Sequence, residues 1–115
     1  MSKILVCEDD EGLRTQLKIL LEDNGHHVIT AENGIAGLAQ LDEATDLDLL
    51  ITDLEMPDLD GLELLSKLRV HPTYAALPSI MLTACNDPAL KKQGRELKVG
   101  AWIIKPHNEK GVLLT

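Results

Sequence analysis

The sequence predicts an α/β fold, in which a doubly wound parallel sheet of five strands has helices on both faces. Two observations predict it. Short apolar runs of strand length alternate along the chain with longer segments whose leucines recur at helical spacing. The apolar runs also lack the alternating polar residues of a half-exposed strand, so they suit strands that are buried on both faces, as in parallel sheets.

The N-terminal part of the chain supplies the first two strands and the first two helices. The apolar run at residues 4–7 is the first expected strand. A helix follows, because leucines recur at helical spacing and Gly25 can terminate it. Residues 27–31 form the second expected strand, and about 35–44 the second expected helix, whose apolar side chains share one face.

The middle of the chain repeats this alternation. The third strand is expected at residues 47–52, and a helix marked by leucines at 62–68 follows until His71-Pro72 ends it. The fourth strand is expected at 79–83. The next helix begins near Asp87-Pro88, with the aspartate as N-cap and the proline in the first turn.

Residues 102–104 form the fifth expected strand, and the tail at 109–115 can make about two turns of helix at most. The length of 115 residues suits one domain, and the chain contains no internal repeat or linker. We therefore expect residues 1–115 to form a single domain whose last helix is short or truncated.

Composition narrows the classes of partner and location. Nineteen acidic and eleven basic residues give a net charge of −8, which argues against direct binding of DNA or RNA. Cys7 and Cys85 lack the spacing of a disulfide framework or a metal site, which favours free thiols in a reducing cytoplasm. No stretch approaches the roughly 18 apolar residues of a membrane span, and nothing near Met1 reads as a signal peptide. We expect a cytoplasmic protein without a membrane partner.

The histidines show no ligand spacing, and we expect them to face solvent: His26, His27, His71 and His107.

Polar residues stand at the ends of four expected strands. Glu8 and Asp9 follow the first strand, Asp53 follows the third, Thr83 ends the fourth and Lys105 follows the fifth. The carboxyl ends of parallel strands meet at one edge of the sheet, where ligands bind in folds of this class. We therefore expect these side chains to lie close together.

Three carboxylates in one pocket repel each other, at about 4 kcal/mol for a pair 4 Å apart in an effective dielectric near 20. A proton or a cation must relieve this repulsion. Mg²⁺ fits best, because the ligands are oxygens and no histidine or cysteine is near in sequence. A carboxylate can also act as a nucleophile and form an aspartyl-phosphate. The oxygens of that group can be held by Mg²⁺, by the ammonium of Lys105 and by the hydroxyl of Thr83.

Four sequence motifs occur in order and with regular spacing: Ile4-Leu-Val-Cys-Glu-Asp-Asp10, Leu50-Ile-Thr-Asp-Leu-Glu-Met-Pro-Asp-Leu-Asp-Gly61, Met81-Leu-Thr-Ala84 and Trp102-Ile-Ile-Lys-Pro106. Through them the chain resembles the response-regulator receiver domain of two-component signalling and is similar to the stand-alone chemotaxis receivers. The match runs from residue 3 to about 107. It implies the flavodoxin-like strand order 2-1-3-4-5 and a signalling switch that phosphorylation activates.

The resemblance implies a role for each matching residue. Asp53 would accept a phosphoryl group from a histidine kinase or phosphotransfer protein, in a Mg²⁺-dependent reaction. Glu8, Asp9 and Asp53 would hold the metal together with the backbone carbonyl of Glu55. Lys105 would pair with the phosphoryl group. The domain would catalyse only its own phosphoryl transfer and dephosphorylation, so we do not expect an enzyme.

The resemblance also implies how the signal leaves the site. Thr83 would contact the phosphoryl group and reorient, and Trp102 stands at the position of the switch aromatic, although packing alone also explains a tryptophan there. The Lys105-Pro106 bond would be cis. The output would pass by protein–protein contact to an unidentified downstream target. Four basic residues on the fourth expected helix are either a solvated face or part of a docking surface: Lys91, Lys92, Arg95 and Lys98.

Several positions depart from the family pattern. Glu8 stands where aspartate is commoner, Lys98 where glycine is usual, and His107 where phenylalanine is usual. These departures and the short tail leave open a degenerate receiver that acts only as a protein-interaction module. A second alternative, an aspartate-nucleophile phosphatase, usually needs an Asp-x-Asp pair, and here Glu55 takes the second place.

Overall fold

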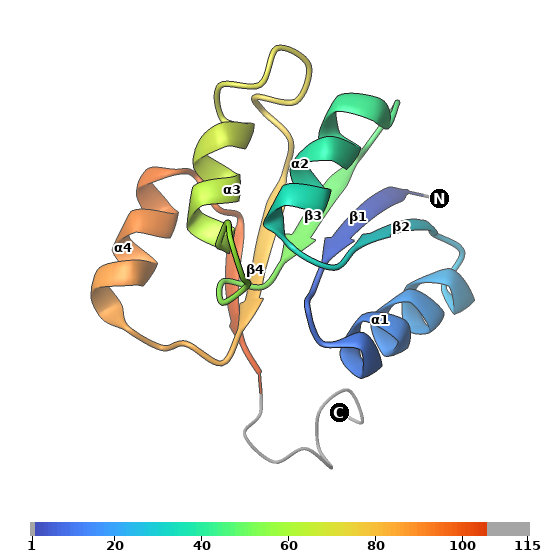
Figure 1. The fold of residues 1–115 in the computed structure, drawn as a ribbon, viewed down its shortest axis with the longest axis horizontal. Coiled ribbons are helices and arrows are strands. Elements are labelled where there is room, and N and C mark those ends of the chain that lie inside the picture. The colour runs from blue at the N-terminus through green and yellow to red at the C-terminus, as the bar shows by residue number, and fades with distance from the viewer. Residues whose placement is uncertain (1, 106–115) are drawn as a thin grey trace.

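Five parallel strands form one sheet in the computed structural model, which describes residues 2–105 (Figure 1). The strands are β1 (Lys3–Cys7), β2 (His27–Ala31), β3 (Leu49–Thr52), β4 (Ser79–Thr83) and β5 (Ala101–Ile104). Their order in the sheet is β2-β1-β3-β4-β5, which confirms the predicted flavodoxin-like order. The order changes direction between β1 and β3, so the carboxyl ends of these two strands border a crevice suited to a ligand.

Four helices connect the strands: α1 (Glu11–Asp23), α2 (Gly34–Glu43), α3 (Gly61–Leu68) and α4 (Pro88–Glu96). Each begins at a residue whose side chain accepts a hydrogen bond from a backbone N–H of the first turn, which satisfies a donor that the helix itself leaves unpaired. These N-cap residues are Asp10, Asn33, Asp60 and Asp87. The expected N-cap at Asp87 is confirmed, whereas the fifth expected helix falls at 109–115, outside the described residues.

Helices cover both faces of the sheet, as predicted (Figure 1). α1 packs on one face through a cluster formed by Ile4, Val6, Leu13, Leu17, Val28 and Ile51. α2 and α3 pack on the other face through a larger cluster that includes Leu5, Cys7, Leu41, Leu50, Leu64, Leu65 and Leu68. A third cluster joins α4 to β4, β5 and the start of α3 through Leu54, Leu62, Met81, Leu90 and Trp102.

The third strand is shorter than predicted, because it begins at Leu49 and not at residue 47. Asp46 adopts a left-handed backbone conformation with φ of 61°, which turns the chain just before the strand. Leu47 is buried nonetheless, and its N–H donates to the hydroxyl of Tyr74 rather than to a strand. Because Leu47 is a buried apolar residue, it extends the apolar run in the sequence beyond the true start of the strand.

His71 does not face solvent, so that expectation is wrong for this residue. Its side chain is 9% exposed, and its Nε2 lies 3.0 Å from a carboxylate oxygen of Asp42. Its Nδ1 accepts hydrogen bonds from the backbone N–H groups of Thr73 and Tyr74. The imidazole thus satisfies the backbone donors of the turn that follows α3, a local role that residue spacing does not reveal.

Arg69 ties the end of α3 to the segment between α4 and β5. Its guanidinium donates to the carbonyl oxygens of Leu97 at 2.7 Å and Lys98 at 3.1 Å. It also donates to the carbonyl of Leu77 at 2.7 Å and to the hydroxyl of Ser79 at 3.0 Å. Burial lowers the pKa of Arg69 below its usual value. This arginine therefore holds the C-terminal end of α4 in place.

None of the four helices described within residues 2–105 has both the length and the apolar character that a membrane span requires.

Candidate functional site

The carboxyl edge of the sheet brings together three of the predicted acidic residues. Glu8 and Asp9 follow β1, Asp53 follows β3, and one carboxylate oxygen from each lies within 4.8 Å of the others. Glu8 and Asp53 are buried, at 2% and 7% exposure, whereas Asp9 is exposed. The site is therefore an acidic pocket that is open to solvent on the side of Asp9.

The backbone around Asp53 is held rigidly. Its N–H donates to the carbonyl of Cys7 at 3.0 Å, and its own carbonyl accepts the hydroxyl of Thr52 at 2.9 Å. Its Oδ1 accepts the N–H of Leu54 at 2.7 Å. α3 starts directly against this turn, because a Cβ at Gly61 would overlap the carbonyl oxygen of Asp53. The glycine at position 61 thus has a steric reason, because it lets α3 begin directly against the backbone of Asp53.

Lys105 reaches this pocket from the end of β5. Its Nζ lies 2.7 Å from Oε1 of Glu8 and 3.2 Å from Oδ2 of Asp53. Its backbone N–H donates to the carbonyl of Thr83 at 2.8 Å, which fixes the position of the Lys105 backbone beside the end of β4. Three carboxylates and one ammonium leave two net negative charges in the pocket (−3 + 1 = −2).

The pKa values of Glu8 and Lys105 are shifted because the two groups lie together in a partly buried site. Burial raises the pKa of Glu8 above its usual 4.5, and the charge of Asp53 adds to this, while the hydrogen bond from Lys105 acts against it. Burial alone would lower the pKa of Lys105. Its hydrogen bond to Glu8 and the charge of Asp53 outweigh that effect and raise the pKa above 10.5. Burial is therefore the main cause of the Glu8 shift, whereas the neighbouring carboxylates cause the Lys105 shift.

The residues present fit a hard divalent cation. All three clustered side chains offer carboxylate oxygens, which Mg²⁺ prefers, and the pocket has two uncompensated negative charges. Glu8 reaches both the cluster and Lys105, which a shorter aspartate would do less readily. Glu55 is exposed and its carboxylate lies outside this cluster, as expected of a residue whose predicted contribution is its backbone carbonyl.

Thr83 and Trp102 are joined through the backbone of Cys85. Thr83 is fully buried, and its Oγ1 accepts the N–H of Cys85 at 3.2 Å. The indole N–H of Trp102, which is half-buried, donates to the carbonyl of Cys85 at 2.9 Å. Trp102 also lies against α4, because a Cβ at Gly94 would sit only 3.0 Å from its ring. Thr83 and Trp102 therefore both hydrogen-bond to one residue of the loop between β4 and α4. Their roles in switching stay predictions.

Sequence reasoning missed two residues that support the site. Arg14 donates from its guanidinium to the carbonyl of Glu8 at 2.9 Å, which anchors the loop after β1 to the first turn of α1. Cys85 links Thr83 to Trp102 only through its backbone groups. Because one end of each contact is a main-chain atom, the residue type at that end gives no signal of the contact. The Lys105-Pro106 bond and His107 lie outside the described residues.

Comparisons with known proteins agree with this geometry. The family described as the response regulator receiver domain matches residues 4–114. The transcriptional regulatory protein ResD of Bacillus subtilis is 37% identical over 113 residues, which are 98% of this chain and 45% of ResD. The chain thus spans less than half the length of that relative. The chemotaxis protein CheY homolog of Campylobacter jejuni is 35% identical over 105 residues, 90% of this chain and 81% of that protein.

A solved structure shows the same fold. The response regulator TrrA from Thermotoga maritima, solved in complex with Mg²⁺-BeF, has a TM-score of 0.80 and 30% identity to this chain. The alignment covers 94% of this chain and 90% of TrrA. With its sheet order, its acidic edge and these matches, the chain belongs to the response regulator receiver domain family of two-component signalling.

Proposed function

We propose that this receiver is a phosphorylation-activated switch that accepts a phosphoryl group on Asp53 in a Mg²⁺-dependent reaction. One observation carries the proposal. The Asp53 carboxylate lies in a cluster with the carboxylates of Glu8 and Asp9 and within 3.2 Å of the Lys105 ammonium. A nucleophile, ligands for a metal and a cation for the incoming phosphoryl oxygens are therefore in one place.

The transfer needs little chemistry from the protein beyond positioning. One Asp53 carboxylate oxygen forms a bond to phosphorus as the bond from phosphorus to the donor breaks, and the donor leaves with that electron pair. Oδ1 is already held by the N–H of Leu54, and Lys105 lies on the Oδ2 side. Mg²⁺, held by Glu8, Asp9, Asp53 and the carbonyl of Glu55, would supply positive charge to the phosphoryl oxygens. Dephosphorylation is the same displacement with water as nucleophile.

The signal would leave the site through Thr83. A phosphoryl oxygen near Asp53 offers the Thr83 hydroxyl a stronger acceptor, and turning toward it gives up the hydrogen bond with the N–H of Cys85. The loop that also holds the indole of Trp102 is then free to move. The result is a shift of population between two states of this loop and of α4.

The expected phosphoryl donor is a histidine kinase or a phosphotransfer protein, and the expected output is a contact with another protein. Family membership supports this class of partner. One relative is a transcriptional regulatory protein and another a chemotaxis protein, so similarity to these relatives does not identify the target of this chain. We propose a cytoplasmic signalling module rather than an enzyme, because its only reactions are on its own Asp53.

Fluorescence of Trp102, the only tryptophan, tests the proposal. We expect a saturable change in its emission with Mg²⁺, and a second change when beryllofluoride, which mimics a phosphoryl group, is added. Asp53→Asn should abolish the second change. A degenerate receiver that only binds proteins would show neither change, and that result would refute the proposed switch. Multiple turnovers on small phosphate esters would instead indicate a phosphatase.

A further inference from the structure

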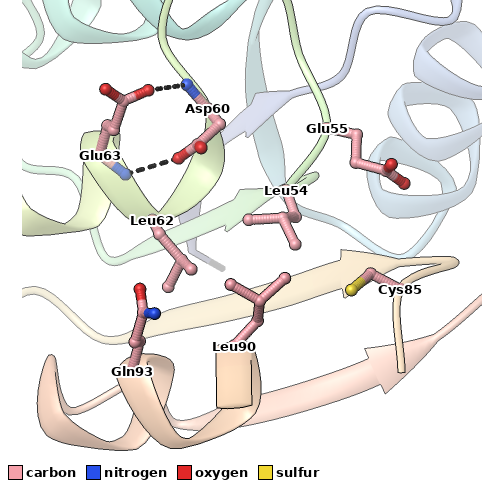
Figure 2. A pocket seen from close by; sticks show the side chains of 8 residues that line it. All are labelled: Leu54, Glu55, Asp60, Leu62, Glu63, Cys85, Leu90 and Gln93. Carbon is pink, nitrogen blue, oxygen red and sulfur yellow. Dashed lines mark hydrogen bonds between the residues drawn. The ribbon is translucent and has the colours of Figure 1, made fainter. Parts of the chain in front are cut away.

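A pocket of about 300 Å³ lies beside the acidic site, between the loop after β3, the start of α3 and the start of α4 (Figure 2). Its base is apolar, because the side chains of Leu54, Leu62 and Leu90 point toward one another. The thiol of Cys85 lies on the same side as Leu90. The phosphorylation chemistry at Asp53 does not account for this hollow.

The rim of this pocket is acidic. Glu55, Asp60 and Glu63 line it on the side of the β3–α3 loop and α3, and none of its lining residues is basic (Figure 2). Asp60 and Glu63 each use one carboxylate oxygen to cap α3, at 2.8 and 2.9 Å, so these two side chains face each other and contribute negative charge to the rim (Figure 2). Glu55 is exposed. Gln93 of α4 adds an amide on the opposite side.

Size, apolar base and charge together define the ligand. A volume of about 300 Å³ is at the small end of ligand pockets and suits one or two side chains. An aliphatic side chain would bury against the three leucines, and a neighbouring cationic side chain would meet the carboxylates of the rim. We propose that this pocket binds a peptide segment of a partner protein in which leucine or isoleucine is followed by arginine or lysine.

The pocket is also placed to respond to the switch, a step that rests on the proposed function. Cys85 lines the pocket, and its N–H is the group that Thr83 holds at 3.2 Å. When Thr83 turns toward Asp53, it releases the N–H of Cys85, so the loop that carries Cys85 can move and the pocket loses the shape that fits the segment. The segment therefore binds the resting state more tightly than the phosphorylated state. By thermodynamic linkage, the bound segment disfavours phosphorylation to the same extent.

Three short probes test the ligand class on the unmodified protein without Mg²⁺. They are N-acetyl-leucyl-arginine amide, N-acetyl-leucyl-glutamate amide and N-acetyl-glycyl-arginine amide, titrated by NMR. We expect the leucyl-arginine probe to bind about tenfold more tightly than the glycyl-arginine probe, because a leucine side chain is buried. Its affinity should exceed that of the leucyl-glutamate probe by at least about fivefold, because the rim carboxylates repel a glutamate. Equal binding of all three would overturn the proposal.

The cysteines locate the probe. Cys7 is buried, and burial raises its pKa to about 12, so iodoacetamide at neutral pH should alkylate Cys85 and spare Cys7. The leucyl-arginine probe should slow this alkylation in proportion to its occupancy. Glu55→Gln should weaken the binding of the leucyl-arginine probe about fivefold. Glu43→Gln, which changes an exposed glutamate on α2, should leave its affinity unchanged. Binding without protection of Cys85 would place the probe elsewhere and refute the site.

A last titration separates the pocket from the switch. With Mg²⁺ and beryllofluoride, the leucyl-arginine probe should bind at least about threefold more weakly. If Trp102 emission responds to beryllofluoride but the affinity stays the same, the proposed coupling is wrong while Asp53 phosphorylation stands. If Trp102 does not respond at all, the proposed function fails, and the titrations without Mg²⁺ still decide whether the pocket binds such a segment.

Discussion

Lys105 sets the electrostatic balance of the site, because its single ammonium lies between two buried carboxylates. Its Nζ is 2.7 Å from Glu8 and 3.2 Å from Asp53, and its side chain is only 15% exposed. Breaking a buried ion pair by removing one partner is costly, since the other charge stays behind without compensation. The resting site therefore depends on Lys105 until a metal ion supplies positive charge.

Lys105→Met should lower the free energy of unfolding by about 3 kcal/mol, because Glu8 and Asp53 then face each other without a cation. Saturating Mg²⁺ should restore part of this loss. Urea unfolding with and without Mg²⁺ measures both effects. Lys67→Met, an exposed lysine on α3, is the matched control and should change stability by less than about 0.5 kcal/mol. Equal losses in the two variants would contradict the role of Lys105.

The raised pKa of Glu8 predicts how Mg²⁺ binding depends on pH. A metal ligand must be deprotonated, and burial holds the proton on Glu8 at higher pH than the usual carboxyl range near 4.5. Affinity for Mg²⁺ should therefore fall as the pH is lowered through this raised pKa, and the fall should begin above the ordinary range. Titrations of Trp102 emission between pH 5 and 8 measure it. An affinity that stays constant until the ordinary range is reached would show that Glu8 is not a ligand.

The same shifts affect stability with a definite sign. The folded-state pKa of Glu8 is above 4.5 and that of Lys105 above 10.5. Each therefore contributes stability that is present below its unfolded value and is lost as the pH rises through the folded value. Without a metal, the Glu8 contribution should already be declining as the pH rises from mildly acidic values. Mg²⁺ should reverse that decline.

Among the elements, α4 is tied to the end of α3 at its C-terminal end. Its C-terminal end is fixed by the hydrogen bonds of Arg69 to Leu97 and Lys98. Its N-terminal end follows the loop that Thr83 and Trp102 share through Cys85, and its face at Gly94 rests on the Trp102 ring. A change at Asp53 should therefore tilt α4 about its C-terminal end rather than displace it as a whole.

Lys98 occupies a backbone conformation that suits glycine, with φ of 62° just after α4. The family pattern has glycine at this position, and the left-handed conformation is the physical reason. Lys98→Gly should raise the free energy of unfolding by about 0.5–1 kcal/mol, measured in urea. Lys98→Ala keeps the strain and removes only the charge, so it should bring no such gain. A loss of stability in the glycine variant would contradict this explanation.

For the molecule as a whole, the parallel sheet and the meeting of the site residues followed from the residue pattern, whereas the strand order followed from the resemblance to receiver domains. Parallel strands place their carboxyl ends at one edge, so Glu8, Asp53 and Lys105 had to approach each other despite wide separation in the chain. Other hydrogen bonds could not be predicted from the sequence, because their acceptors are main-chain carbonyl oxygens. The carbonyls that Arg69 binds carry no signal of residue type, and neither do the backbone groups of Cys85.

The pocket between α3 and α4 was also unpredictable, for a different reason. Its base and rim come from the β3–α3 loop, α3 and α4, and the side chains converge only once α4 has packed beside α3. Leu62 belongs to the leucines at 62–68 that predicted a helix, and Leu90 lies in α4. Their shared hollow depends on how the two helices are spaced, which periodicity within one helix cannot reveal.

Intact-protein mass after incubation with a small acyl phosphate tests the central claim, phosphorylation of Asp53, most directly. The wild type and Asp23→Asn, a matched change at an exposed aspartate of α1, should each gain one phosphoryl group, and only with Mg²⁺ present. Asp53→Asn should gain none. If Asp53→Asn gains as much as the wild type, Asp53 is not the acceptor and the account of the site is wrong.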